Sequence, residues 1–176
     1  MQTASQRQAR CLSYIALGSN LGDSRRIILE AMARLQKLSD RPLLKSSLWQ
    51  TSPVNCPPNS PLFVNAVVGF TPQKNETPES LLQKLHALEK EFGRTPKMVL
   101  NEPRPLDLDL IAFGTETRNS QELILPHPRA HLRRFVLQPL SEIAPHLILP
   151  GQSKTISQLL AGLPETETVK RLDATP

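Results

Sequence analysis

The chain has 176 residues, a formal net charge of +5 and an isoelectric point near 9.6. That length suits a single domain that buries its own core, and its two cysteines, Cys11 and Cys56, are too few for a disulfide framework and lack the spacing of a zinc site. No stretch approaches the ~20 apolar residues of a membrane span or resembles a signal-peptide core, so we expect a cytoplasmic protein with no membrane partner.

The first part of the chain predicts a strand, a turn and a helix. Residues 14–17 form a short apolar run that ends at the small and polar residues 18–23. Asp23 or Ser24 can cap a helix in which apolar residues recur at helical spacing over residues 27–38. A strand followed by a helix is therefore expected.

Two more strands are expected at residues 46–50 and 64–70. The segment between them, residues 51–61, is rich in proline and too long for a tight hairpin turn. A loop of this composition is either a binding loop or a plain excursion, and the composition leaves both open.

The second helix has the clearest signals in the chain. Thr77 is its cap, Pro78 occupies the first helical position, and Gly93 follows the end. Within it, Glu89 adjoins the apolar stripe, and periodicity alone indicates an ordinary solvated glutamate. Residues 94–103 then form a polar, proline-broken segment that is typical of a mobile loop, and such a loop beside a reaction site can act as a lid.

Asp107 and Asp109 lie in the sequence Leu-Asp-Leu-Asp-Leu. Side chains alternate along a strand, so both carboxylates share one face and the leucines share the other. The pattern fits a carboxylate seat for Mg²⁺, which prefers oxygen ligands and commonly binds with substrate phosphates. It equally fits a half-buried strand with a solvated acidic face.

The rest of the chain predicts two helices, at residues 131–142 and 155–160, the latter capped by Ser153. The resulting β-α-β-β-α-β order indicates an α+β fold, a ferredoxin-like sandwich with a mainly antiparallel sheet and helical additions at the C-terminal end. We expect one domain over residues 13–163, with flexible termini at 1–12 and 164–176. No phosphate-loop or dinucleotide fingerprint is present.

Several other side chains are candidates for phosphate binding. Arg94, Arg104 and Arg133 each flank a segment of interest, and a guanidinium group can bind two phosphate oxygens at once. Each of them can also be an ordinary surface arginine. His127, fixed between two prolines, is either a phosphate donor or a turn histidine with a local hydrogen bond.

Five segments, in this order, resemble the 6-hydroxymethyl-7,8-dihydropterin pyrophosphokinases of folate biosynthesis. They are Tyr14–Asp23, Phe63–Val67, Glu89 with Gly93-Arg94, Pro103–Asp109, and Pro126–Arg129 leading to Arg133–Leu137. The resemblance covers about residues 13–163. It implies transfer of pyrophosphate from the co-substrate ATP to the hydroxymethyl group of the dihydropterin, giving AMP, by a monomer with no nucleic-acid partner.

The resemblance also implies roles for individual residues. Asp107 and Asp109 would bind two Mg²⁺ ions, and with Arg94 and Arg104 they form the expected catalytic set. The residues expected to bind ATP are Leu82, Glu89, Arg94, Arg104, Leu110, His127 and Arg133. Those expected to bind the pterin are Thr51, Ser52, Pro53, Val54, Phe63, Asn65 and Phe135, with the two phenylalanines enclosing the ring.

The chain departs from the family pattern in the expected lid. Pro96 and Asn101 stand where well-known members carry an arginine and a tryptophan. Two other classes remain in view. A glycosyltransferase or nuclease with the same Asp-x-Asp would need a larger fold or further acidic ligands. A basic nucleic-acid-binding module is supported by the charge alone, with aromatics at only 4% of the chain.

Overall fold

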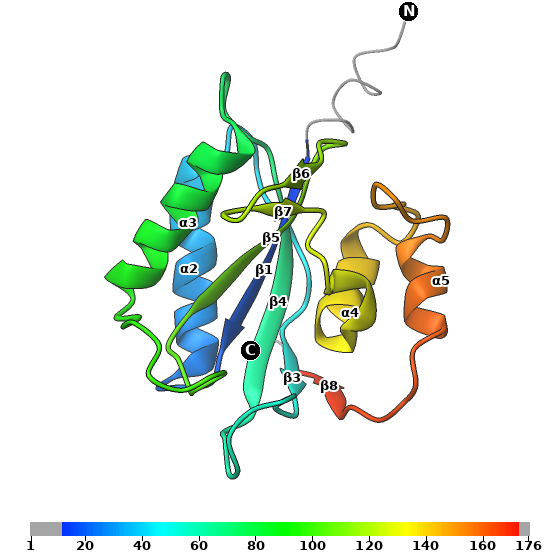
Figure 1. Ribbon diagram of the computed structural model, residues 1–176. Helices are drawn as coiled ribbons and strands as arrows, with labels where there is room; N and C mark the ends of the chain where they lie inside the picture. The colour runs from blue at the N-terminus through cyan, green and yellow to red at the C-terminus, as the bar shows by residue number, and fades with distance from the viewer. Residues whose placement is uncertain (1–11, 173–176) are drawn as a thin grey trace, which may run out of the picture.

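The computed structural model describes residues 12–172, in which a twisted sheet carries helices on both faces (Figure 1). The main path of the sheet has the order β5-β1-β4-β3-β8, and β2 pairs with β4 beside β3. Its strands are β1 (Ser13–Ser19), β2 (Leu44–Lys45), β3 (Trp49–Thr51), β4 (Phe63–Phe70), β5 (Asp107–Phe113) and β8 (Val169–Arg171). Neighbouring strands are all antiparallel, which confirms the predicted mixed fold with an antiparallel sheet.

Four helices cover the two faces of the sheet. Helices α2 (Ser24–Leu38) and α3 (Pro78–Glu91) lie on one face, and α4 (Arg134–Ile143) and α5 (Ile156–Ala161) lie on the other (Figure 1). A 3-10 turn, η1 (Ala130–Leu132), precedes α4, and a hairpin of β6 (Arg118–Asn119) and β7 (Ile124–Leu125) follows β5. None of the helices within residues 12–172 combines the length and the hydropathy needed to cross a bilayer.

The alternation of side chains in β1 and β5 divides the core into two layers. Ile15, Leu17, Leu108 and Leu110 pack toward α2 and α3. Tyr14 and the neighbouring Ile111 pack instead with α4 and α5. Asp107 and Asp109 have the same parity as Ile111, so they lie on the α4 face. Both faces of the sheet are therefore covered by helices, and the acidic pair lies where the α4 layer ends.

The helix starts follow the sequence signals in two cases and differ in a third. Asp23 caps α2 by accepting from the Arg26 N–H at 3.2 Å, and Thr77 caps α3 in a capping box with Ser80. Helix α5 is capped by Thr155, where Ser153 was predicted. Thr155 Oγ1 accepts from the Gln158 N–H at 3.2 Å and the Gln158 side chain accepts from the Thr155 N–H at 2.9 Å, so this reciprocal pair fixes the start.

Two predicted elements are interrupted. The strand expected at 46–50 is found only from residue 49, in β3. Residues 46–48 lie between β2 and β3, where the Ser46 hydroxyl accepts from the Val67 N–H at 2.9 Å and the Ser46 N–H donates to the Val67 carbonyl. The helix expected at 131–142 begins as the turn η1 and becomes α-helical only after Arg133. The β6–β7 hairpin was not predicted.

The segment after α5 also differs from the prediction. Residues 169–171 form β8, which pairs with β3 from Trp49↔Arg171 to Thr51↔Val169, so the expected flexible tail is wrong for these residues. The backbone bond from the Ser52 N–H to the Thr168 carbonyl, 3.1 Å, extends the pairing. The remaining terminal residues of that prediction, 1–11 and 173–176, lie outside the described part.

Candidate active site

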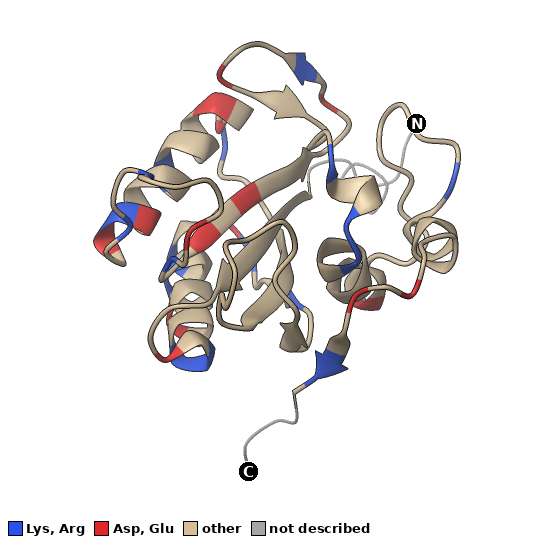
Figure 2. Ribbon diagram, turned by 60° about the horizontal axis from the view of Figure 1, so that its bottom comes forward, with Lys and Arg blue, Asp and Glu red and all other residues tan. Residues whose placement is uncertain are grey.

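A cleft of about 430 Å³ opens on the α4 face, across the ends of β5, β1, β4 and β3. Most of the site residues expected from the sequence line it: Thr51, Ser52, Val54, Phe63, Asn65, Glu89, Arg94, Arg104, Asp107, Asp109, His127, Arg133 and Phe135. Figure 2 shows the acidic part of β5 in the middle of the molecule, with basic residues on the segment before α4 across from it. Residues from distant parts of the chain thus meet in one cavity.

The floor of the cleft is formed by a decrease in side-chain size along β1. Tyr14 is buried under the α4 layer, while Ala16 and Gly18, on the same face, line the cleft. A Cβ atom at Gly18 would lie 3.0 Å from Oδ1 of Asn65, and Gly18 pairs with Asn65 in the register of β1 and β4. Gly18 therefore leaves the space that the Asn65 side chain occupies.

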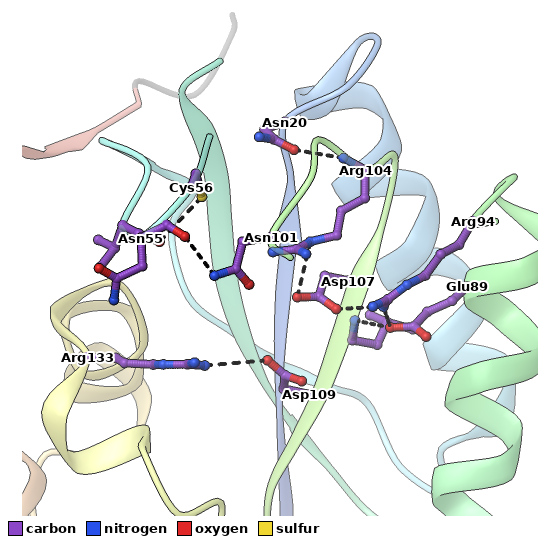
Figure 3. A network of polar contacts seen from close by, with 12 residues as sticks. Asn20, Asn55, Cys56, Glu89, Arg94, Asn101, Arg104, Asp107, Asp109 and Arg133 are labelled. Atoms are coloured by element: carbon purple, nitrogen blue, oxygen red, sulfur yellow. Dashed lines mark hydrogen bonds and ion pairs between the residues drawn. The ribbon is translucent and has the colours of Figure 1, made fainter. Parts of the chain in front are cut away.

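Asp107 and Asp109 project from the same face of β5, as predicted, and arginines contact them from two sides (Figure 3). Arg94 Nη1 lies 2.6 Å from Asp107 Oδ1, and Arg104 Nε lies 3.5 Å from Asp107 Oδ2. Arg133 Nη1 is 4.0 Å from Asp109 Oδ2. The acidic pair is therefore surrounded by three fixed positive charges.

The two aspartates differ in their electrostatic setting. Burial, together with the negative charge of Asp107, raises the pKa of Asp109 to about 6, although Arg133 and Arg104 oppose the shift. A cation bound beside Asp109 would stabilise the ionised form of this carboxylate, which burial disfavours.

Glu89 is buried, with 5% of its surface exposed, so the solvated glutamate indicated by periodicity is wrong. Its Oε1 accepts from the Leu108 backbone N–H at 2.7 Å and forms an ion pair with Arg94. Burial raises the pKa of Glu89 to about 7 against these favourable contacts. Glu89 thus contacts the backbone between the two aspartates and the arginine that binds Asp107.

His127 is held in a defined orientation by the backbone. Its N–H donates to the Ile111 carbonyl of β5 at 2.8 Å, and its ring Nδ1 accepts from the Arg129 N–H at 3.1 Å. Burial, with Arg133 and Arg129, lowers the pKa of His127 to about 4, so the ring is neutral at pH 7. Because Nδ1 is an acceptor, Nε2 carries the proton and is available as a donor.

The other end of the cleft is less charged. Asn65, buried on β4, donates from Nδ2 to Thr51 Oγ1 at 2.6 Å, which leaves its Oδ1 free as an acceptor. Phe63 and Phe135 also line this end, and each has a guanidinium group over its ring: Arg104 at 5.6 Å from the Phe63 centroid and Arg133 at 5.4 Å from that of Phe135. The two phenylalanines therefore lie next to the arginines that are expected to bind phosphate.

Two asparagines, Asn20 and Asn101, connect the loops around the cleft (Figure 3). Asn20, just after β1, accepts from the Arg104 N–H through Oδ1 at 2.9 Å and donates to the Pro61 carbonyl through Nδ2 at 3.4 Å. Asn101 donates from Nδ2 to the Asn55 carbonyl at 2.8 Å. The segment at 94–103 is thus joined to the proline-rich loop at 51–61.

The family model for 7,8-dihydro-6-hydroxymethylpterin-pyrophosphokinase (HPPK) matches residues 14–145. The chain belongs to this family. It is 38% identical over 160 residues to the 2-amino-4-hydroxy-6-hydroxymethyldihydropteridine pyrophosphokinase of Pseudomonas aeruginosa, covering 90% of this chain and 95% of that protein. The corresponding enzyme of Haemophilus influenzae is 35% identical over 158 residues, which cover 90% of this chain and 96% of that one.

Longer proteins also contain an HPPK region. The chain is 40% identical over 144 residues to the folic acid synthesis protein fol1 of Pneumocystis carinii, which covers 82% of this chain but 19% of that protein. A crystal structure of Plasmodium falciparum HPPK-DHPS with pteroate has a similar fold, with a TM-score of 0.67 at 15% identity, over 85% of this chain and 42% of that one. This chain therefore spans only a part of those two proteins.

Three of the expected site residues do not line the cleft. The Leu110 side chain is buried in the core beneath α2 and α3, and Leu82 packs against the same core. Pro53 is also not among the lining residues. A contact of Leu110 with ATP would have to use its backbone groups, because the Leu110 side chain is buried.

The cleft also contains residues without a role in the expectations from sequence, among them His86, Cys56 and Glu167. His86 follows Leu85 on α3, and nothing in the helical pattern separates it from a solvated residue. Glu167 lies in the polar tail that was expected to be flexible. Its proximity depends on the β3–β8 pairing, for which the sequence has no local signal.

The donor set fits a hard divalent cation that is shared with a substrate. Within residues 12–172, no group of three or more His, Cys, Asp or Glu side chains is placed to hold a metal ion. Two carboxylates on one strand face match Mg²⁺, which commonly takes one or two carboxylates and completes its shell with water and phosphate oxygens.

Proposed function

We propose that the protein transfers the terminal pyrophosphoryl group of ATP to the hydroxymethyl oxygen of 6-hydroxymethyl-7,8-dihydropterin, giving AMP and the pterin diphosphate. The observation that carries this proposal is the polarity of the cleft. One end holds two carboxylates among arginines, and the other holds an oriented amide with two phenylalanines. A triphosphate and a flat heterocycle fit these two ends respectively.

At the charged end, Arg94, Arg104 and Arg133 bind and orient the triphosphate. The transferred group passes through a loose transition state, so positioning and charge neutralisation are the main contributions of the protein. His127 adds a neutral donor at Nε2, fixed by the Arg129 N–H. A fixed donor needs no reorganisation as charge develops on the phosphate oxygens.

Asp107 and Asp109 would hold two Mg²⁺ ions. When bound, these ions supply charge neutralisation to the phosphates and polarise the reacting oxygens. The common face of the two carboxylates and their position in the cleft beside the arginines support this proposal.

At the other end, the pterin lies between Phe63 and Phe135, where apolar ring faces replace water. Asn65 Oδ1 accepts from a donor on the heterocycle because Nδ2 is already bonded to Thr51. Backbone groups of residues 51–54 also contact the polar edge of the pterin, as expected from the resemblance. The hydroxymethyl arm then points along the sheet toward β5.

The same proposal includes a single domain, which β8 extends beyond the expected residues 13–163, and which acts as a monomer with a ferredoxin-like core. Its support is the strand order β5-β1-β4-β3, with α2 and α3 together on one face. In this scheme α4 and α5 are the helical additions, and α4 carries Phe135 into the cleft.

The test is a nucleotide analysis of the reaction mixture. We expect conversion of ATP to AMP only when both Mg²⁺ and 6-hydroxymethyl-7,8-dihydropterin are present. Asp109→Ala should lower kcat by at least a thousandfold while the protein unfolds cooperatively and still binds the pterin. Release of ADP, or turnover without the pterin, would contradict the proposed reaction, and loss of cooperative unfolding in the variant would identify Asp109 as structural.

A further inference from the structure

The proposed reaction leaves one half-buried acidic side chain of the cleft, that of Glu167, without a role. Glu167 lies in the segment between α5 and β8, beyond residues 14–145 that match the HPPK family model, yet it lines the cleft with Thr51, Ser52 and Phe135. This segment crosses below α4 to reach the edge of the sheet at β3 (Figure 1). The C-terminal segment is thus part of the cavity wall.

Backbone pairing fixes Glu167 at this position. The next residue, Thr168, accepts from the Ser52 N–H at 3.1 Å and donates its own N–H to Ser52 Oγ at 3.3 Å. The strand β8 follows immediately and pairs with β3 over three residues. Glu167 is therefore anchored next to the loop that is expected to contact the pterin.

The hydrogen bonding of the Glu167 carboxylate is incomplete. Its Oε2 is buried, and no partner for this atom is found among the described residues. Burial raises the pKa of Glu167, while the charges of Arg134 and Arg133 and the Phe135 backbone N–H oppose the shift. Buried carboxylate oxygens almost always have a donor, so this group is poised to accept one. Glu167 also lines the cleft, and the terminal torsion of a glutamate is broad, so rotation about it changes which groups the carboxylate faces.

The strand order determines which end of a bound pterin reaches Glu167. Asp107 and Asp109 lie on β5, and β8 lies at the opposite end of the order β5-β1-β4-β3-β8. Neighbouring strands are about 4.8 Å apart, so β5 and β3 are separated by about 14 Å. If the 6-hydroxymethyl arm faces the aspartates, the opposite end of the ring, which carries the 2-amino group, lies toward Ser52 and Glu167.

We propose that Glu167 is an additional substrate-binding residue, whose carboxylate accepts a hydrogen bond from the 2-amino group of the pterin. The inference rests on the proposed function. An amino group conjugated to the ring is a pure donor, and a carboxylate gives it a charge-assisted hydrogen bond. The C-terminal segment then selects for heterocycles that have a donor at this position.

The test compares binding of two ligands, with a nonhydrolysable ATP analogue and Mg²⁺ present. The wild type must first form AMP, because its failure to do so would refute the proposed function and not this inference. Glu167→Ala should raise the Kd for 6-hydroxymethyl-7,8-dihydropterin about tenfold, the loss of one charge-assisted hydrogen bond. The Kd for the analogue with hydrogen in place of the 2-amino group should be the same in the wild type and the variant.

Glu165→Ala is the matched control, since this glutamate is exposed in the same segment and does not line the cleft. It should bind both ligands as the wild type does. An unchanged Kd for the pterin in Glu167→Ala would overturn the inference. An equal loss for both ligands would also overturn it, because that result is expected if Glu167 only supports the start of α4. Thermal unfolding of each variant verifies that the proteins compared are folded.

Discussion

Arg94 makes contacts with two acidic side chains at once. It pairs with Glu89 and lies 2.6 Å from Asp107, while Glu89 accepts from the Leu108 N–H between the two aspartates. Glu89 is therefore connected to both aspartates of the proposed site, through Arg94 and through the backbone of β5. Its raised pKa makes this link sensitive to pH.

The pKa of Glu89 leads to the first residue-scale prediction. Because the pKa is raised to about 7 in the folded protein, the folded state binds more protons than the unfolded state at pH values between the ordinary glutamate value and 7. The contribution of Glu89 to the free energy of unfolding is thus largest at low pH and is lost as pH rises through this window. Glu89→Gln removes the effect. The free energy of unfolding of the wild type, relative to that of the variant, should therefore fall by about 2 kcal/mol as pH rises through this window.

Urea unfolding at a series of pH values measures this difference. Glu91→Gln is the control, because Glu91 lies on the same helix with its side chain half exposed. A pH-independent difference for Glu89→Gln would contradict the assignment of the raised pKa.

The second prediction concerns Phe135. Truncation in Phe135→Ala removes one face of the expected ring sandwich, so the Kd for the pterin should rise at least tenfold while that for ATP changes less than threefold. Phe135→Leu keeps an apolar surface, so its Kd for the pterin should lie between those of the wild type and Phe135→Ala. Equilibrium binding of each ligand tests this, and an unchanged pterin affinity in Phe135→Ala would count against the sandwich.

The residue scale also shows what the sequence predicts and what it does not. Alternation in β5 predicts the common face of Asp107 and Asp109, because that property is local. The burial of Glu89 is not predictable from helical periodicity, since its partner, the Leu108 N–H, belongs to another element. Glu167 has the same difficulty, because the pairing that anchors it joins residues 116 positions apart in the sequence.

At the scale of elements, the expected lid is connected to the proline-rich loop by Asn101. This residue has a φ of 55° and donates to the Asn55 carbonyl, so it serves both as a left-handed turn residue and as a link between loops. A glycine adopts the same backbone without the side chain, which makes the two functions separable.

The third prediction uses this separation. Asn101→Gly should increase amide hydrogen exchange at least threefold in both residues 94–103 and residues 51–61, because it removes the Asn101–Asn55 hydrogen bond between them without straining the turn. Asn75→Gly is the control, since Asn75 also has a positive φ, 68°, in an exposed turn elsewhere. Faster exchange in the lid alone, with no change at 51–61, would show that Asn101 does not connect the loops.

Elements with strong local signals were predicted well. Thr77, Pro78 and the apolar stripe define α3 without tertiary information. The strand predicted at 46–50 forms only from residue 49, because the Val67 N–H bonds to the Ser46 hydroxyl, a contact between distant residues that the local sequence does not indicate. The cap of α5 was misplaced by two residues, where Ser153 and Thr155 are both acceptable cap residues and only the Gln158 side chain distinguishes them.

For the whole molecule, β8 closes the edge of the sheet next to the expected pterin end. The fourth prediction is that deletion of residues 164–176 leaves a folded protein whose melting temperature is lower by about 5 °C, because β3 loses its pairing partner. Pterin binding should weaken at least tenfold, and ATP binding should change little. Deletion of residues 173–176 alone is the control and should reproduce the wild type. An unchanged pterin affinity in the protein lacking residues 164–176 would show that this segment does not contribute to the cleft.

The decrease in side-chain size along β1 has a consequence for the size of substrate that the cleft accepts. The volume of the cleft depends on the small size of Ala16 and Gly18, in addition to the groups that contact ligands. A methyl group added at Gly18 would lie 3.0 Å from Asn65 Oδ1, so it would narrow the chamber and displace the amide that is expected to contact the pterin. A screen for altered acceptors would therefore begin at these two floor positions, where side-chain size sets the space left for a substrate.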